Sequence, residues 1–322
     1  MRQFAKPTIV VSKCLEFDAC RYNGEMIPDV TIRNLQPFVT FIPVCPEVEI
    51  GLGTPRETIR IVEENGENRL VQPSTREDVT EKMEQFSNDF LQTISDVDGF
   101  ILKNRSPSCG TRDVKIYSGF EKAPAKGKGS GLFGGAVVKK FSHLPIEEEG
   151  RLSNFIIREH FFTRLFTIAY YKMIKHNKNM KDLVSFQSDN KYLFMAYNQV
   201  KQKELGRIIA NHKNEKIEVV FENYEKILYE LFMRTPRYTS NVNVCEHIFG
   251  YFKTKLKKQE KDHFIELLQK YAEKKIPLSS LLTILKSWAI RFDEKYLLRQ
   301  TYFEPYPEAL VEISDSGKGR DY

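Results

Sequence analysis

The sequence predicts an α/β protein of two domains, the second of which is helical. Short apolar runs that end at proline or at polar turns, as buried strands do, are concentrated in the first half of the chain. Residues 75–94 carry apolar side chains at three- and four-residue steps, as in a helix packed on a sheet. Beyond Arg151 the periodicity is helical almost throughout. We therefore expect a Rossmann-like, three-layer α/β domain over residues 1–148 and an all-α helical bundle over residues 149–322.

Three of the predicted strands are each followed by a cysteine. The apolar runs are residues 8–12 before Cys14, residues 38–44 before Cys45 and residues 100–102 before Cys109. The third run cannot continue through Pro107, because proline lacks a backbone donor. In an open α/β sheet the carboxyl ends of parallel strands form one edge, and ligands bind there. We expect the three cysteines to converge on one site at that edge.

A hairpin is predicted between the second and third of these strands. Residues 57–63 and 68–72 have strand-like composition and flank Glu64-Asn65-Gly66-Glu67, whose Asn-Gly pair is typical of a two-residue turn. The flanking segments are rich in charged residues. We interpret this hairpin as an exposed β-arm.

A glycine-rich segment lies near the end of the first domain. Residues 129–134 match the G-x-G-x-x-G pattern of dinucleotide-binding proteins. That fingerprint needs a preceding strand, and the sequence before it, Lys-Ala-Pro-Ala-Lys-Gly-Lys, does not have the composition of a strand. We therefore interpret the segment as a flexible loop before a helix.

The second half of the chain contains several amphipathic helices. Apolar residues recur at helical spacing in residues 155–170, 193–209, 217–233, 244–256, 264–271 and 278–296. Aromatic residues alternate with cations in residues 190–197, 233–239 and 247–258, a composition suited to stacking on bases and contacting phosphates. Most of these aromatic side chains are expected in the core. The candidates for RNA contact are Arg237, Tyr238, His247, Tyr251 and Lys253.

Composition and charge restrict the class of protein. With 322 residues, of which 41% are hydrophobic and 29% charged, the chain is long enough for about two soluble domains. No run approaches the roughly 20 apolar residues that span a bilayer, and the N-terminus leads into a strand and not a signal-peptide core. We expect a cytoplasmic protein without a membrane partner.

The net charge of +6 is unevenly distributed along the chain. Residues 1–150 contain 19 Lys and Arg against 22 Asp and Glu, a balance of −3, whereas residues 151–322 contain 30 against 21, a balance of +9. Such asymmetry indicates a nucleic-acid or other anionic partner for the basic half. A solvated, lysine-rich helical surface gives the same totals, so both interpretations stay open.

The five cysteines are unevenly spaced and odd in number, which does not suggest a secreted disulfide framework. Cys14 and Cys20 lack the C-x-x-C spacing of a zinc ribbon. Cys14, Cys45 and Cys109, without an obvious fourth, favour an iron–sulfur cluster with one iron that lacks a protein ligand. The alternative is that they are small buried hydrophobic residues. Cys20 is a secondary candidate for the site, and Cys245, inside a predicted helix, is expected in the core.

Several motifs resemble a known family. Residues 12–24 (Ser-Lys-Cys-Leu…Cys-Arg-Tyr-Asn-Gly), 43–56 (Pro-Val-Cys-Pro-Glu-Val…Gly-Leu-Gly-Thr-Pro-Arg) and 99–110 (Gly-Phe-Ile-Leu-Lys…Ser-Pro-Ser-Cys-Gly) are similar to the TudS-type thiouracil desulfidases. Residues 191–197 and 237–253 resemble the helical domain fused to it in two-domain proteins of the RudS type, which remove sulfur from 4-thiouridine in transfer RNA.

The resemblance implies a cofactor, a reaction and a set of site residues. Cys14, Cys45 and Cys109 match the ligands of a [4Fe–4S] cluster whose fourth iron takes the sulfur of the thiolated base. Glu47 and one of two serines, Ser106 or Ser108, match the residues that assist the attack of water. The implied activity is a non-redox, hydrolase-type conversion of 4-thiouridine in tRNA to uridine with release of sulfide, a form of tRNA modification. Free thiouracil and thiouridine are further expected substrates.

The chemistry of the residues is consistent with that reaction. The thiocarbonyl carbon is electrophilic, but its sulfur leaves poorly until a soft acceptor such as iron takes it. Glu47 is suited to act as a general base on water, with a serine hydroxyl to orient water or substrate. Two other functions stay open. One is an RNA-binding protein with a structural or sensory iron–sulfur site, and the other is a thiol redox enzyme, for which the sequence has no C-x-x-C motif.

Overall fold

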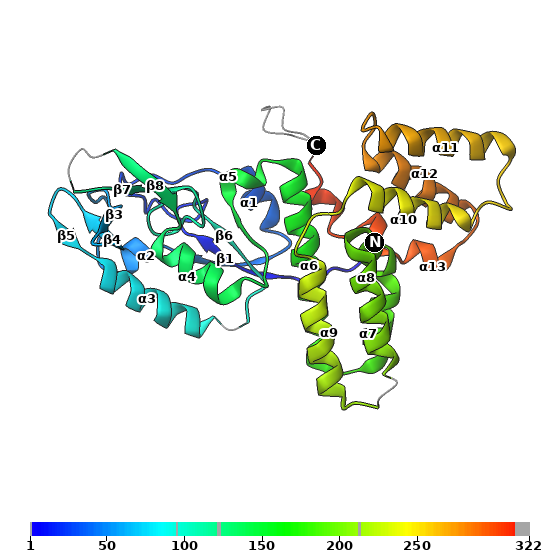
Figure 1. Ribbon diagram of the computed structural model, residues 1–322, viewed down its shortest axis with the longest axis horizontal. Coiled ribbons are helices and arrows are strands. Elements are labelled where there is room, and N and C mark those ends of the chain that lie inside the picture. The colour runs from blue at the N-terminus through cyan, green and yellow to red at the C-terminus, as the bar shows by residue number, and fades with distance from the viewer. Residues whose placement is uncertain (1, 95, 121–123, 212–213, 313–322) are drawn as a thin grey trace. The chain divides into compact units, whose positions relative to one another are not determined.

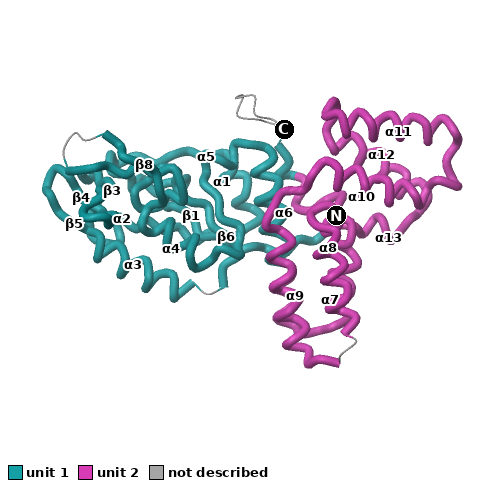
Figure 2. The backbone as a smooth tube through the Cα atoms, viewed as in Figure 1, with its two compact units in different colours: residues 1–169, 309–321 teal, residues 170–308, 322 magenta. Residues whose placement is uncertain are grey.

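The computed structural model describes residues 2–94, 96–120, 124–211 and 214–312 (Figure 1). The chain divides into two compact units, one formed by Met1–Ala169 with Ala309–Asp321 and the other by Tyr170–Glu308 with Tyr322 (Figure 2). The first unit is mixed α/β and the second is helical, which confirms the predicted fold class. The first unit continues past residue 148 into helix α6 (Phe155–Asn177). The domain boundary after residue 148 stays a prediction.

The first unit contains a four-stranded parallel sheet with the strand order β2-β1-β6-β9. Its central strands are buried except at Thr8, the first residue of β1, as expected when a parallel sheet is covered on both faces. This burial explains why they appear in the sequence as continuous apolar runs without alternation. The strands are Thr8–Ser12 (β1), Thr40–Val44 (β2), Gly99–Leu102 (β6) and Ile146–Glu148 (β9).

A second sheet of five strands lies in the same unit, in the order β5-β4-β3-β7-β8. The predicted hairpin forms between β3 and β4, with Asn65 and Gly66 at positive φ in the turn. The interpretation as an exposed arm was wrong, because the hairpin is central in this sheet and Ile61, Val62 and Leu70 are buried. The strands are Arg60–Glu64 (β3), Glu67–Gln72 (β4), Glu77–Asp78 (β5), Val114–Tyr117 (β7) and Ala125–Gly129 (β8).

Strand β8 contradicts the expectation that the segment before the glycine motif is not a strand. It pairs antiparallel with β7 at the edge of the second sheet, and four of its five residues are exposed. An exposed edge strand does not need apolar side chains, and lysine at an edge discourages pairing with other chains. The Lys-Gly composition is therefore compatible with an edge strand, although it lacks the usual sequence signal.

Helices of the first unit cover the sheets and follow the strand ends. Helices α3 and α4 lie side by side (Figure 1). They pack through Phe86, Phe90 and Phe133, whose rings lie about 6 Å apart. Helix α3 confirms the helix expected over residues 75–94. Helix α4 begins at Leu132, inside the motif of residues 129–134, so the expected helix is present but residues 132–134 form its first turn and are not part of a loop. The helices are Val30–Leu35 (α1), Pro46–Glu49 (α2), Thr80–Thr93 (α3), Leu132–Phe141 (α4) and Glu149–Leu152 (α5).

The second unit is built around a core rich in aromatic side chains. Tyr171, Phe186 and Tyr224 are buried there with ring centroids 5.5–6.2 Å apart. After α6, its helices are Met180–Asp189 (α7), Lys191–Ala210 (α8), Ile217–Leu231 (α9), Tyr238–Gly250 (α10), Lys258–Ala272 (α11), Leu278–Arg291 (α12) and Lys295–Leu298 (α13), followed by the short 3₁₀ turns Thr301–Phe303 and Glu308–Leu310. Within the described ranges, no helix combines the length and apolar character needed to cross a membrane.

Three features of the helical unit differ from the sequence-based expectation. The helix expected over residues 278–296 ends at Arg291, and α13 is a separate short helix after Asp293, whose φ is positive. Helix α7 was not predicted, and α10 begins at Tyr238, before the apolar repeat that starts at Val244. Both segments bury a polar side chain on the core face. The hydroxyl of Tyr224 donates to Gln187 Oε1 at 2.6 Å, and the hydroxyl of Tyr302 donates to Asn241 Oδ1 at 2.9 Å. Buried, hydrogen-bonded polar residues interrupt the apolar periodicity, so the pattern alone misses them.

Candidate active site

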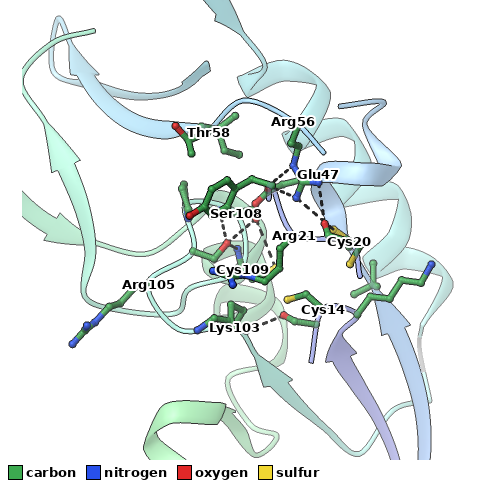
Figure 3. A pocket seen from close by; sticks show the side chains of 18 of the residues that line it. Cys14, Cys20, Arg21, Glu47, Arg56, Thr58, Lys103, Arg105, Ser108 and Cys109 are labelled. Carbon is green, nitrogen blue, oxygen red and sulfur yellow. Dashed lines mark hydrogen bonds and ion pairs between the residues drawn. The ribbon is translucent and has the colours of Figure 1, made fainter. Parts of the chain in front are cut away.

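The three strand-end cysteines line one cavity of about 350 Å³ in the first unit (Figure 3). Strands β1, β2 and β6 are parallel neighbours, so Cys14, Cys45 and Cys109 lie beyond the same edge of the sheet. Strand β1 lies between the other two, and the chain order reverses at this point, where open α/β sheets bind ligands. The predicted convergence of the three cysteines is confirmed. Cys20 also lines the cavity.

All five cysteines are free thiols, and those at the cavity affect one another electrostatically. Burial, together with a smaller contribution from the nearby Cys45 thiolate, raises the pKa of Cys14 to about 12. Burial also raises the pKa of Cys20 to about 12, again with a contribution from Cys45. The pKa of Cys109 is raised by burial and by the thiolates of Cys14 and Cys45. Ionised together, these sulfurs repel one another, so a positively charged group between them favours their thiolate forms.

Residues outside the predicted set contact the sulfurs. Ser12 donates a hydrogen bond to the Cys109 sulfur, which favours the thiolate and lowers its pKa. The ammonium of Lys103 lowers the pKa of Cys14 and pairs with Glu149. Sequence reasoning missed both residues, although each directly adjoins or ends one of the cysteine-bearing strands. That position at the carboxyl end of a strand is the signal that identifies them.

Glu47 is held between an arginine and a serine at the cavity wall (Figure 3). Its Oε2 atom accepts hydrogen bonds from Arg56 Nε at 2.8 Å and Arg56 Nη2 at 2.6 Å. Its Oε1 atom accepts from Ser108 Oγ at 2.6 Å. Glu47 lies on α2, and the sequence resemblance includes Arg56 in its second motif without a role for it. The structure therefore brings Glu47 and Ser108 together and adds Arg56 to the pair.

The two candidate serines form one hydrogen-bonded chain. Because a carboxylate only accepts, Ser108 Oγ donates its proton to Glu47. The contact of 2.9 Å between the two serine oxygens is then made with Ser106 as donor. Ser106 Oγ accepts from the backbone N–H of Cys109 at 3.1 Å and of Ser108 at 3.3 Å. The chain of donors therefore runs from Ser106 through Ser108 to Glu47.

The glycine motif packs against the turn that carries Cys109. The N–H groups of Leu132 and Gly134, in the first turn of α4, donate to the carbonyl oxygens of Pro107 and Ser108 at 3.1 and 2.9 Å. A methyl group added at Gly134 would overlap the carbonyl oxygens of Cys109 and Gly110. The motif therefore permits close contact between backbones. This packing agrees with the expectation that the segment is not a dinucleotide site.

The cavity is also lined by residues that suit a nucleotide. Tyr22 is 43% exposed, and the Arg21 guanidinium lies 5.5 Å from the centre of its ring. Arg105, exposed and at a φ of 56°, lies in the turn before Ser106. All three residues line the cavity that contains the cysteines. They supply an aromatic face and two cations beside the candidate active site.

The candidate RNA-contacting residues of the second unit fall into two groups along α10. Arg237, exposed at the N-cap, and half-buried Tyr238 lie at one end of the helix. His247, Tyr251 and Lys253 are exposed at or just beyond the other end, roughly 15–20 Å away along a helix that rises 1.5 Å per residue. The structure does not bring the five residues together at one point.

Cys245 lies apart from the cavity, in the core of the second unit. Cys245 is fully buried in the second unit with its sulfur 3.9 Å from the Tyr302 hydroxyl, so its predicted place in the core is confirmed. Among the described residues, no three His, Cys, Asp or Glu side chains are grouped around a single metal position.

Comparison with known proteins identifies the family. A family model described as 2-thiouracil desulfurase matches residues 9–149, the part of the chain that contains the cavity. The uncharacterized protein YbbK of Bacillus subtilis (strain 168) is 36% identical over 118 residues, which are 34% of this chain and 77% of YbbK. The chain belongs to the 2-thiouracil desulfurase family. Its second part, residues 191–307, matches a model described as a protein of unknown function (DUF1722).

The chain is also similar to a second bacterial protein and to one solved structure. The uncharacterized protein YbgA of Escherichia coli (strain K12) is 23% identical over 156 residues, 48% of this chain and 92% of YbgA. The solved structure of the [4Fe-4S]-dependent thiouracil desulfidase TudS is 26% identical and covers 46% of this chain and 93% of its own, with a TM-score of 0.36. The family assignment rests on the sequence matches.

The packing of α4 predicts that Gly134→Ala destabilises the first unit. The added methyl group must displace the backbone that carries Cys109, so we expect a loss of about 1–3 kcal/mol in the free energy of unfolding, as for other overpacked sites. Gly127→Ala is the control, because a methyl group there meets open space. Urea denaturation measures the free energy of unfolding of each variant. Hydrogen exchange of peptides from β1 and β6 then shows whether the loss of stability lies in the first unit. Equal stability of the two variants contradicts this account of the glycine motif.

Proposed function

We propose that the protein is a [4Fe–4S]-dependent, non-redox desulfidase that converts 4-thiouridine in tRNA to uridine and releases sulfide. The observation that carries the proposal is the cavity at which Cys14, Cys45 and Cys109 meet the Glu47–Ser108 pair. Three soft donors and an acid–base pair at one site suit the removal of sulfur from a carbon atom. Membership of the 2-thiouracil desulfurase family supports the same reaction class.

The donor set of the cavity fits an iron–sulfur cluster. Cys14, Cys45 and Cys109 approach from three different chain segments, as thiolate ligands of separate irons in one cluster do. Burial, and after it the mutual repulsion of the thiolates, raises the pKa values of Cys14 and Cys109, and a cationic group between the sulfurs offsets both effects. When bound, the cluster supplies a soft iron that accepts the sulfur of the thiolated base.

The residues around the cavity supply the proton chemistry. Glu47 Oε1 accepts the proton of Ser108 Oγ, and Ser108 Oγ in turn accepts from Ser106. With one donor and two acceptor positions on a hydroxyl, Ser108 Oγ retains one lone pair for a proton from water or substrate. A proton received there is passed to Glu47 Oε1. We assign Glu47 as the general base, Ser108 as the group that transfers the proton, and Ser106 as the residue that orients Ser108.

The choice of RNA as substrate rests on features in both units. At the cavity, Tyr22 offers a ring for base stacking, and Arg21 and Arg105 offer cations for phosphate. Residues 151–322 have a net balance of +9, and Arg237 and Lys253 are exposed on or beside α10. When such cations contact phosphates of RNA, counterions are released from the RNA, and this release increases the binding affinity. Small thiolated pyrimidines also fit a cavity of about 350 Å³, so they are expected as weaker substrates.

The hydrogen bonds of Glu47 predict that Glu47→Gln separates binding from chemistry. The amide keeps the size of the side chain and one acceptor oxygen, which can face Arg56 while the NH2 group donates to Ser108 Oγ, but it removes the base. We expect turnover of 4-thiouridine to fall by roughly 10²–10⁴-fold, while the visible spectrum and RNA affinity stay unchanged. Glu49→Gln, an exposed residue of the same short helix, is the control and is expected to retain normal turnover.

Nucleoside analysis of tRNA after anaerobic incubation measures this turnover. Normal activity of Glu47→Gln would remove Glu47 as the base and leave Ser108 or a water as the remaining candidates.

The proposed partner predicts salt-dependent catalysis on tRNA. We expect kcat/KM of the full chain for tRNA carrying 4-thiouridine to decline as a power of salt concentration, because phosphate contacts release counterions. Arg237→Gln should lower the slope of log kcat/KM against log salt by about one, the value for loss of one phosphate contact. Arg69→Gln is the control, since Arg69 is paired with Asp78 on the second sheet. Sulfide release and uridine formation are measured together.

Two results contradict the proposal. Turnover of free 4-thiouracil that equals or exceeds that of tRNA at every salt concentration would exclude RNA as the preferred substrate. Binding of tRNA without release of sulfide would instead favour an RNA-binding protein with a structural or sensory cluster.

A further inference from the structure

The guanidinium of Arg56 has an unusual number of partners for a side chain that is only 4% exposed. Its Nε and Nη2 groups donate to the same oxygen of Glu47, and Nη1 donates to the carbonyl oxygens of Cys20 at 2.9 Å and Gly53 at 2.8 Å. Nη2 also lies 4.0 Å from the sulfur of Cys45. An arginine has five N–H donors, and these contacts, together with a longer one of 3.4 Å from Nη1 to Thr54 Oγ1, leave none of the five without a partner.

The pattern of these bonds determines how Glu47 is presented. Both N–H groups that face the carboxylate bind Oε2, which leaves Oε1 for Ser108. A bidentate contact with one N–H on each oxygen would compete with the serine for Oε1. The carbonyl oxygens of Cys20 and Gly53 fix the guanidinium from the other side, so its orientation is set by the backbone. The carboxylate is therefore held in one rotational state.

The same guanidinium places a positive charge beside one of the three thiols. Nη2 lies 4.0 Å from the sulfur of Cys45, at the outer limit of a hydrogen bond to sulfur, so the interaction is mainly that of a nearby positive charge. Hydrogen bonds to ligand sulfurs and nearby charge both tune the potential of iron–sulfur clusters. Reduction adds negative charge to a cluster, so a cation at this position favours the reduced form and raises the reduction potential.

We propose that Arg56 is a positioning residue that couples the two parts of the site: it directs Glu47 Oε1 to Ser108 and holds a positive charge against the sulfur of Cys45. The part that concerns Cys45 rests on the proposed function, because it requires a cluster on that cysteine. The part that concerns Glu47 rests on the contacts of the protein alone.

The test uses the full chain, purified without oxygen, as Arg56→Gln, Arg56→Lys and, as control, Thr54→Ala. Thr54 Oγ1 is a weaker acceptor of Arg56 at 3.4 Å, so its loss alters the same loop without removing the charge. Two quantities are measured. They are the reduction potential, by titration monitored with electron paramagnetic resonance, and kcat and KM for tRNA carrying 4-thiouridine.

We expect Arg56→Gln to shift the reduction potential downward and to lower kcat by 10–100-fold, the range seen for residues that support metal ligands, with KM unchanged. Arg56→Lys keeps the charge, so its potential stays close to that of the wild type. Its kcat still falls, because an ammonium does not reproduce the planar fork that binds one carboxylate oxygen twice. Thr54→Ala should match the wild type in both measurements.

If Arg56→Gln has the reduction potential of the wild type, the proposed role of Arg56 at Cys45 is overturned. If Arg56→Lys has the kcat of the wild type, the proposed role of Arg56 in positioning Glu47 is overturned. If Arg56→Gln does not fold, the kcat of Arg56→Lys decides the inference. Failure of the proposed function looks different, since the wild type itself then lacks turnover. Normal turnover in Glu47→Gln with a shifted potential in Arg56→Gln would refute the general base but retain the role at Cys45.

Discussion

The convergence of three thiols, two buried and one half-buried, at one edge of the parallel sheet is the constraint on which the rest of the site depends. Cys14, Cys45 and Cys109 are brought together because β1, β2 and β6 are parallel neighbours. Without a positive group between them, burial and mutual repulsion keep Cys14 and Cys109 protonated, as their raised pKa values indicate. A protein that maintains this arrangement must offset an electrostatic cost that grows when the sulfurs ionise.

The surroundings of the sulfurs are organised to offset that cost. Ser12 donates to Cys109, Lys103 lies beside Cys14, and Arg56 lies beside Cys45, so each sulfur has its own donor or cation. Helix α4 can approach the turn of Cys109 because Gly134 has no side chain, and this contact fixes the sulfur against the sheet. The same turn carries both serines. The rigidity that positions the thiols therefore also positions the proton chain to Glu47.

Much of this arrangement could be predicted from the sequence, and the exceptions have physical causes. The buried strands and the cysteines that follow them were predicted because a parallel sheet covered on both faces leaves continuous apolar runs. Strand β8 was missed because an exposed edge strand does not need such a run, and α7 was missed because Gln187 replaces an apolar residue on its core face. The link from Arg56 to Glu47 and Cys45 depends on contacts across a turn, which spacing along the chain does not reveal.

The iron and acid-labile sulfide content of the protein purified without oxygen tests the central claim most directly. We expect about four irons and four sulfides per chain with broad absorbance in the visible range, as thiolate-bound clusters of this type have. Replacing Cys14, Cys45 or Cys109 by alanine should abolish both, whereas Cys245→Ala should leave them unchanged because that sulfur is buried in the other unit. A colourless protein that holds a single zinc ion under the same conditions would contradict the account.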